Sequence, residues 1–339
     1  MNRWYLSVGS REIRVTLVKA QAAGGPGVHV LGVKMKSLYI AILVLFSAQF
    51  VYAGSGSSTK PLQGAYPIVL SHGILGFDDR VGLLGGAIKY WGGMDDYLRG
   101  QGVAVLTPGT NPIQSVPNRA NDQRNQINTW MAANGFTKVH ILAHSQGALV
   151  SRYMVSSLGM AGKVSTITTV NGVNRGTPIA DIALAVIPSW LQPTLNTVVN
   201  IISQLVYGKT QQDIIAMTSS LTVGNVNALN TANPNAAGVK YYSYGSKITL
   251  PDLVQHPLMG LVYPITWTGG VFNGQGGDND GVVPLSSHKW GTWMGGPSYS
   301  ILTTGVDHIE AINFAGTGQT WYDVKAYYLK MASNAKANQ

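Results

Sequence analysis

Ser145 lies in the pentapeptide AHSQG (143–147), which follows the nucleophile-elbow pattern with alanine in place of the first glycine. The flanking residues must be small because the serine of such an elbow lies on a strained turn where neighbouring elements come close. The motif alone is weak, since it arises about 0.2 times by chance in a chain of this length. Its context strengthens it, because the apolar run KVHILAHS predicts a strand that ends at the serine, and a helix is predicted from about Gln146 to Leu158. The pattern favours a nucleophilic serine over an exposed turn serine.

A serine hydroxyl at its free pKa is a poor nucleophile, so a base must lie nearby and a third group must orient that base. On a scaffold with such an elbow, the acid and then the histidine follow the serine along the chain. The histidines beyond the elbow are His256, His288 and His308. His308 follows the predicted strand YSILTTG, so its loop can reach back over the end of the sheet. We expect His308 to be the base and the other two to be surface or packing residues.

The acid should lie between the serine and the histidine. The segment GGDNDGVVP (276–284) offers Asp278 and Asp280 in a glycine-rich loop that can aim a carboxylate. Asp280 is the better candidate and Asp278 is the reserve. Asp307 adjoins the base, and we expect it to cap its own loop.

A tetrahedral intermediate also needs backbone donors. One should be the N–H of Gln146, which follows the nucleophile, and the other should come from a loop after an early strand. The segment SHGILGF (71–77) directly follows the apolar run PIVL and places Ile74 to donate its N–H. His72 in the same loop could be mistaken for a base, but a role in shaping the turn is the better interpretation.

The segments that position these residues alternate between short apolar runs and longer amphipathic ones. One amphipathic stretch, 118–135, predicts a helix with Ile127, Trp130 and Met131 on one face and Gly135 as its stop. The predicted strands are 67–70, 103–109, 138–145, 164–172, 240–246 and 299–305. Strands that alternate with helices favour an α/β fold, with a mostly parallel sheet covered by helices on both faces. The simplest organisation is one domain over 54–339.

Residues 183–207 depart from this alternation because they are strongly apolar, almost uncharged and interrupted by Pro188 and Pro193. Two fixed core helices would explain them. The alternative is a mobile apolar lid over the active site, with hinges near Gly176 and Gly208.

Composition excludes several other classes of function. The chain of 339 residues is 45% hydrophobic and only 11% charged, which is ample material for a core. Its net charge is +9, but residues 1–53 contribute +5 of this and no dense basic stripe follows, so nucleic-acid binding is not expected. The absence of cysteine excludes disulfides, zinc–thiolate sites and cysteine nucleophiles.

The amino-terminal region predicts export. Lys34 and Lys36 precede the apolar run 38–46, and small residues at 51 and 53 complete a signal peptide over 35–53 with cleavage after Ala53. A membrane anchor is the alternative, but the run is shorter than the about 20 apolar residues that span a bilayer. Residues 1–34 do not fit either pattern and are interpreted as an upstream, non-native extension, with Met35 as the true start.

Five motifs together resemble the secreted bacterial true lipases of the Pseudomonas and Burkholderia type. They are HGILGF, AHSQGALVSRY, NGVNRGTPIAD, NDGVVP and DHIE, in that order over most of residues 66–315. The resemblance implies an α/β-hydrolase fold and a triacylglycerol lipase acting on lipid or ester at an oil–water interface. It implies Ser145, Asp280 and His308 as the catalytic residues, Ile74 and Gln146 as the oxyanion donors, and the segment near 183–207 as the lid.

The chain departs from this family in two respects. Many members have a disulfide, which a chain without cysteine cannot form. Many also bind a structural calcium ion near the catalytic histidine through two aspartates, although the chemistry itself requires no cofactor. Glu310 could replace one aspartate, but the other position falls near His256, and imidazole is a poor ligand for calcium. The dedicated folding chaperone that many members need is not implied by any feature of this sequence.

Three interpretations of function stay open. The first is a lipase for water-insoluble esters, and the second is an esterase for soluble short-chain esters or a depolymerase of a solid polyester. The third is a non-catalytic binding module on a hydrolase scaffold, which the presence of Ser145, Asp280 and His308 disfavours.

Overall fold

The structure is a computed structural model that describes residues 60–79, 88–186, 211–299 and 303–339, together with single positions between these ranges. The predicted extension (1–34), the predicted signal peptide (35–53) and the predicted lid beyond Val186 lie outside these ranges. Among the described residues, no helix is long and apolar enough to cross a membrane.

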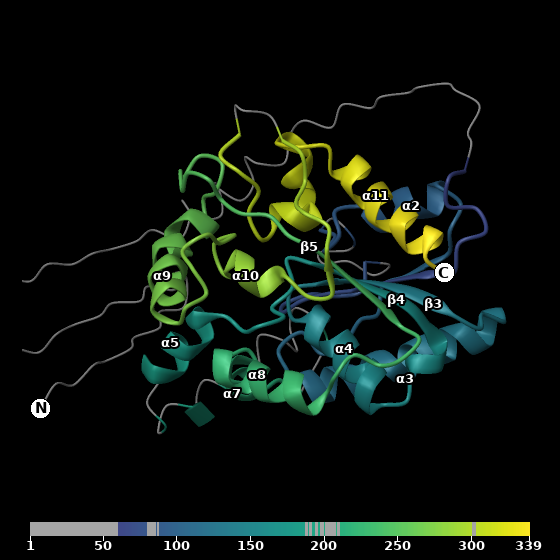
Figure 1. The fold of residues 1–339 in the computed structure, drawn as a ribbon, viewed down its shortest axis with the longest axis horizontal. Coiled ribbons are helices and arrows are strands. Elements are labelled where there is room, and N and C mark those ends of the chain that lie inside the picture. The colour runs from purple at the N-terminus through teal and green to yellow at the C-terminus, as the bar shows by residue number, and fades with distance from the viewer. Residues whose placement is uncertain are drawn as a thin grey trace, which may run out of the picture. The chain divides into compact units, whose positions relative to one another are not determined.

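Six strands form one sheet in which every neighbouring pair is parallel, in the order β2-β1-β3-β4-β5-β6 (Figure 1). All residues of the central strands β1, β3 and β4 are buried, as expected for a parallel sheet covered on both faces. The predicted fold class is therefore confirmed. The strands are β1 (Ile68–Ser71), β2 (Val105–Leu106), β3 (Val139–His144), β4 (Val164–Val170), β5 (Lys240–Tyr244) and β6 (Thr292–Trp293).

The strand predicted over 299–305 is wrong for the part that the structure describes. Tyr299 and Gly305 form only isolated antiparallel bridges, with Tyr322 and Ile248. The sixth strand is instead β6. It has only two residues, which are too few to form an apolar pattern in the sequence. The last segment before His308 is thus a loop, and Gly305 within it has a φ of 101°, which an extended strand cannot accommodate.

Helices cover both faces of the sheet. α3 and α4 pack on one face, and α2 and α11 pack on the other (Figure 1). Successive residues of β1 point to opposite faces, so Val69 joins the core under α3 and α4, whereas Ile68 and Leu70 join the core under α2 and α11. The helices are α2 (Met94–Gly100), α3 (Val116–Asn134), α4 (Gly147–Ser157), α5 (Pro178–Val186), α7 (Ile214–Ser219), α8 (Val223–Ala232), α9 (Met259–Phe272), α10 (Leu285–His288) and α11 (Val324–Ala337).

The helix predicted over 118–135 is α3, which begins two residues earlier than expected. Ile127 and Met131 are buried, and Trp130 packs against the same core. Gly135 ends the helix with a φ of 68°, a left-handed conformation that glycine adopts without steric cost. Both the apolar face and the stop signal of this helix are therefore confirmed.

α5 and α9 pack against each other and expose apolar side chains. Gly269 of α9 lies against Pro178 of α5, where an added Cβ would come within 2.6 Å of the proline ring. Both helices carry solvent-exposed apolar residues, and we call this set the apolar face: Ile182, Val186, Leu261, Ile265, Trp267, Val271 and Phe272. Exposed apolar side chains on two packed helices are available for contact with another apolar surface.

Candidate active site

Ser145 lies on the sharp turn between β3 and α4. Its φ of 55° is unusual for a residue other than glycine and is the strain expected of a nucleophile elbow. A Cβ on Gly147 would come within 2.3 Å of the carbonyl oxygen of Ser71, and one on Gly73 would come within 2.6 Å of the Ser145 Cβ. Gly147 of the motif must therefore lack a side chain because β1 approaches it closely. Gly73 must lack one because the loop after β1 approaches Ser145.

Asp280 and His308 form a short hydrogen bond. His308 Nδ1 lies 2.6 Å from Asp280 Oδ2, and the backbone N–H of His308 donates to the carbonyl oxygen of Asp280 at 3.0 Å. The other carboxylate oxygen, Oδ1, accepts from the N–H groups of Val282 and Val283. The glycine-rich loop 276–284, which the sequence predicted to carry the acid, therefore holds Oδ1 of Asp280 and directs Oδ2 toward the His308 ring.

The His308 ring lies beside the elbow, since its centroid is 4.5 Å from that of His144, the residue before Ser145. Its Nε2 has no hydrogen-bond partner among the described residues. The structure thus brings the three predicted catalytic residues to one edge of the sheet. The catalytic roles of Ser145, Asp280 and His308 stay predictions.

Asn171 also holds Asp280, and the sequence analysis missed it. This residue directly follows β4 and donates from Nδ2 to Asp280 Oδ2 at 2.8 Å. Burial alone would raise the pKa of Asp280, but the neighbouring imidazoles of His308 and His288 outweigh burial and hold the pKa below its ordinary value. Asp280 is therefore an ionised carboxylate. A polar residue at the carboxyl end of a buried parallel strand was the signal that could have identified Asn171.

The alternative acids and bases do not take the positions of Asp280 and His308. Asp278 is 58% exposed and pairs with Lys247 at 2.8 Å, so it points away from His308. Asp307 accepts from the N–H groups of Ile309 and Glu310 and caps its own loop, as predicted. His288 is buried with Nε2 3.3 Å from Asp280 Oδ2, which makes it a packing residue beside the acid.

The predicted oxyanion donors belong to the elbow and to the loop that follows β1. The backbone N–H groups of Ile74 and Gln146 have no hydrogen-bond partner among the residues that the structure describes. The loop that carries Ile74 lies against the nucleophile, because the neighbouring Gly73 is in close contact with Ser145. Two N–H groups without a partner in the described part of the chain, one next to Ser145 in the sequence and one in the loop that contacts it, can donate hydrogen bonds to a tetrahedral oxyanion.

Arg119, which the sequence analysis also missed, joins the two loops that carry these donors. It is buried, and its Nη2 donates to the carbonyl oxygen of His72 at 2.8 Å while its Nη1 donates to the side chain of Gln146. Burial lowers the pKa of this guanidinium to about 10, so it stays charged at neutral pH. His72 itself packs between Arg119 and Thr110 and is structural, as the sequence indicated.

Tyr90 and His144 form a buried chain of hydrogen bonds behind the site. The N–H of Gly73 donates to Tyr90 Oη at 2.8 Å, Tyr90 Oη lies 2.7 Å from His144 Nδ1, and His144 Nε2 lies 3.0 Å from the carbonyl oxygen of His308. A backbone N–H only donates and a carbonyl only accepts, so Tyr90 donates to Nδ1 and Nε2–H donates to His308. Burial and the nearby His308 hold the pKa of His144 well below its ordinary value, which keeps this ring neutral.

A second group of titratable side chains lies next to the base. His256, Asp307 and Glu310 are all buried, with His256 Nδ1 3.2 Å from Asp307 Oδ2 and 3.4 Å from Glu310 Oε2. Burial alone would lower the pKa of His256, but the hydrogen bonds and charges of the two carboxylates outweigh it and raise the pKa to about 10. The ring is therefore an imidazolium between two acids.

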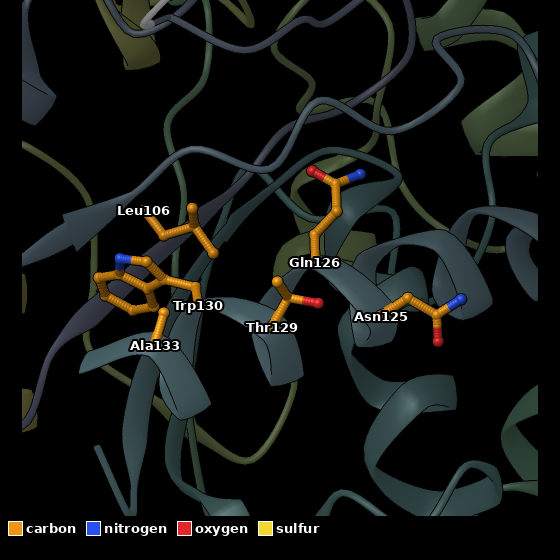
Figure 2. A pocket seen from close by; sticks show the side chains of 6 residues that line it. All are labelled: Leu106, Asn125, Gln126, Thr129, Trp130 and Ala133. Carbon is orange, nitrogen blue, oxygen red and sulfur yellow. The ribbon is translucent and has the colours of Figure 1, made fainter. Parts of the chain in front are cut away.

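A surface pocket of about 440 Å³ lies away from these residues. It is formed by one face of α3 together with Leu106 of β2, as Figure 2 shows. Its lining is Leu106, Asn125, Gln126, Thr129, Trp130 and Ala133, which includes no titratable group and no residue of the elbow or its partners. This pocket is not part of the candidate active site.

The chain has relatives among curated lipases. No protein-family model matches the chain. The triacylglycerol lipase of Vibrio cholerae is 29% identical over 282 residues, which cover 76% of this chain and 85% of that protein. The triacylglycerol lipase of Burkholderia plantarii is 31% identical over 180 residues, about half of each chain. The chain is a relative of the bacterial triacylglycerol lipases. The resemblance seen in the sequence motifs is confirmed.

Solved structures of lipases and esterases share the fold of this lipase relative. The lipase of Staphylococcus hyicus superposes with a TM-score of 0.61 at 16% identity, covering 84% of this chain and 98% of that chain. A metagenomic carboxyl esterase superposes with a TM-score of 0.59 at 14% identity, covering 86% and 80%. The architecture is thus the α/β-hydrolase fold that these lipases and esterases share.

Proposed function

We propose that the protein is a serine carboxylic-ester hydrolase that forms an acyl-enzyme on Ser145. The observation that carries this proposal is the 2.6 Å hydrogen bond between Asp280 and His308, held beside a strained serine elbow. Asp280 fixes the imidazole with its proton on Nδ1, which leaves Nε2 free to take a proton from the serine. A structural role alone would not require His308 to keep one ring nitrogen without a partner among the described residues while the other is bonded to Asp280.

The reaction follows from these positions. His308 Nε2 takes the Ser145 proton as the serine oxygen bonds to the ester carbonyl carbon, and the N–H groups of Ile74 and Gln146 stabilise the oxyanion. The intermediate collapses, the C–O bond to the alcohol breaks, and His308 gives its proton to the leaving alkoxide. Water then attacks the acyl-enzyme. His308 takes a proton from this water and gives it to the Ser145 oxygen as the bond to the acyl group breaks, which releases the carboxylic acid and restores Ser145.

Lipid esters, with triacylglycerols foremost, are the substrate class that we favour. The apolar face on α5 and α9 suits an enzyme that works at an oil–water interface, where lipid replaces water over exposed apolar side chains. The relatives named triacylglycerol lipase support the same choice. An esterase for short-chain soluble esters, or an extracellular polyester depolymerase, is the alternative.

Two measurements test this proposal. A fluorophosphonate probe should label the wild-type protein at Ser145 and leave Ser145→Ala unlabelled, and absence of labelling in the folded wild type would refute the serine mechanism. Hydrolysis rates on p-nitrophenyl esters of graded chain length, compared with emulsified triglyceride, should favour long chains and the emulsion. A rate that falls steadily with chain length would instead identify the short-chain esterase.

The apolar face offers a sharper test of the lipid preference. Leu261→Ser and Phe272→Ser alter side chains that are 61% and 85% exposed, so neither change should disturb the core. Both variants should lose activity on emulsified triglyceride while they hydrolyse a monomeric short-chain ester at the wild-type rate. Equal rates on both substrates would remove the apolar face from substrate binding.

We further propose that the protein is exported and that its signal peptide is cleaved after Ala53. The supporting observation is the sequence pattern of residues 35–53, a basic start, an apolar run and small residues before the cleavage position. The intact mass of the exported protein should correspond to a chain that begins at Gly54. A membrane-bound product that retains residues 35–53 would indicate an anchor instead.

A further inference from the structure

The loop that carries His308 is fixed on its inner side by His256. Asp307 and Glu310 flank His308 in the sequence, and both carboxylates turn toward the His256 ring, at 3.2 and 3.4 Å from Nδ1. The opposite ring nitrogen, Nε2, lies 3.2 Å from the carbonyl oxygen of Thr304. One imidazole thus contacts both ends of the segment 304–310, and His308 lies within that segment.

The segment preceding α9 supplies the rest of this attachment. Gln255 donates from Nε2 to the carbonyl oxygen of Gly305 at 2.8 Å and accepts from the N–H of Thr304 at 2.9 Å. His256 and Gln255 therefore hold the backbone at 304–305, and His256 also contacts the carboxylates of Asp307 and Glu310. Both residues are buried, so water does not compete for these hydrogen bonds.

The donor set does not fit the calcium ion that the family resemblance implies. Calcium takes six to eight oxygen ligands, whereas the atom facing Asp307 and Glu310 here is a ring nitrogen that donates a proton. The ring fills the space between the carboxylates. One oxygen, Glu310 Oε1, is buried without a hydrogen-bond partner among the described residues.

Two buried carboxylates nevertheless require a compensating positive charge. An unpaired carboxylate in a protein interior costs several kcal/mol. Within the described parts of the chain, neither Asp307 nor Glu310 pairs with a lysine or an arginine, and His256 is the partner of both. The His256 ring contacts both carboxylates through Nδ1 and the Thr304 carbonyl oxygen through Nε2, so it links the groups that an ion would otherwise link.

We propose that the side chain of His256 takes the place of a structural calcium ion and positions the loop that carries the catalytic base. His256 is a positioning residue, since it contacts Asp307, Glu310 and Thr304 and acts on the reaction through the placement of His308. The fold of this protein is therefore independent of calcium.

The wild-type protein provides the first test. Its melting temperature should be the same in EDTA and in calcium, and elemental analysis of the purified protein should find less than 0.1 equivalent of bound metal. A fall in melting temperature in EDTA, or one equivalent of calcium or zinc, would overturn the proposal.

His256→Asp provides the second test, because it restores an oxygen ligand opposite Glu310. In EDTA this variant should melt below the wild type and show a reduced kcat, since three buried carboxylates then repel one another. Saturating calcium should raise its melting temperature by on the order of 5 °C and restore kcat. His256→Asn, the matched control without the added charge, should lose stability and gain nothing from calcium.

Failure of this inference can be told apart from failure of the proposed function. The restoration of kcat rests on the proposed role of His308, whereas the melting temperatures do not depend on any activity. If His256→Asp folds but binds no calcium, the loop is not an ion-equivalent site and the proposal is wrong. If that variant does not fold, the wild-type metal analysis still decides.

Discussion

Two groups of histidine and carboxylate side chains meet at the short loop 304–310, and only one of them is suited to chemistry. His308 meets one carboxylate, that of Asp280, at 2.6 Å, and its second ring nitrogen has no partner among the described residues. His256 meets two carboxylates at 3.2 and 3.4 Å, and its second ring nitrogen is already bonded to the loop. A histidine can serve as a base when one nitrogen is oriented and the other stays free. A histidine bonded at both nitrogens is a structural link.

Removal of the nucleophile or the base should produce the largest effect. Ser145→Ala, His308→Ala and the double variant should each lower kcat by on the order of 10⁶, because residues that act as a unit do not contribute additively. The melting temperature should change little, since neither residue is part of the hydrophobic core. Steady-state rates and thermal melts on the three proteins check this. Losses that multiplied in the double variant would show that Ser145 and His308 act independently.

Substitution of the acid should be the next largest effect. Asp280→Asn should lower kcat by about 10⁴, because the amide no longer favours the histidine tautomer with a free Nε2. Asp278→Asn is the matched control two residues away, and it should keep nearly wild-type kcat because its exposed carboxylate pairs with Lys247. The reverse pattern, with Asp278→Asn inactive and Asp280→Asn active, would move the acid role to Asp278.

The sequence could predict those parts of the molecule whose signals are local. The buried runs predicted β1, β3 and β4, and the glycine-rich loop before GVVP indicated Asp280, because strand burial and tight turns leave patterns within a few residues. Tyr90 and Arg119 left no such pattern. Tyr90 bonds to His144 across 54 residues and Arg119 bonds to Gln146 across 27, so only the folded chain brings these partners together.

The two histidines show the same limit of prediction from sequence. His256 and His308 are the same residue type, and each contacts carboxylates that lie at least 28 positions away in the sequence. The residue pattern by itself predicted His256 as a surface or packing residue, because its partners Asp307 and Glu310 are 51 and 54 positions later; only the family resemblance placed it near Glu310. Likewise, the predicted strand at 299–305 was inferred from an apolar run, whereas the bridges of Tyr299 and Gly305 depend on tertiary contacts.

Tyr90→Phe should give the smallest of the three effects on activity. It tests the comparison between His308 and His256, because it loosens the attachment of His308 without changing the His308 ring. The substitution leaves the Gly73 N–H and His144 Nδ1 buried without their partner, at a cost of about 1–3 kcal/mol in stability. We expect kcat to fall about tenfold with KM unchanged, because the chain from Gly73 to the His308 carbonyl affects the placement of the base rather than ground-state binding. Tyr241→Phe is the matched control, since Tyr241 is also buried and also accepts a backbone N–H, from Ala236, but lies outside the site. If both variants lose stability and neither loses kcat, Tyr90 and His144 support only the fold, and the orientation of His308 depends on Asp280 and the loop alone.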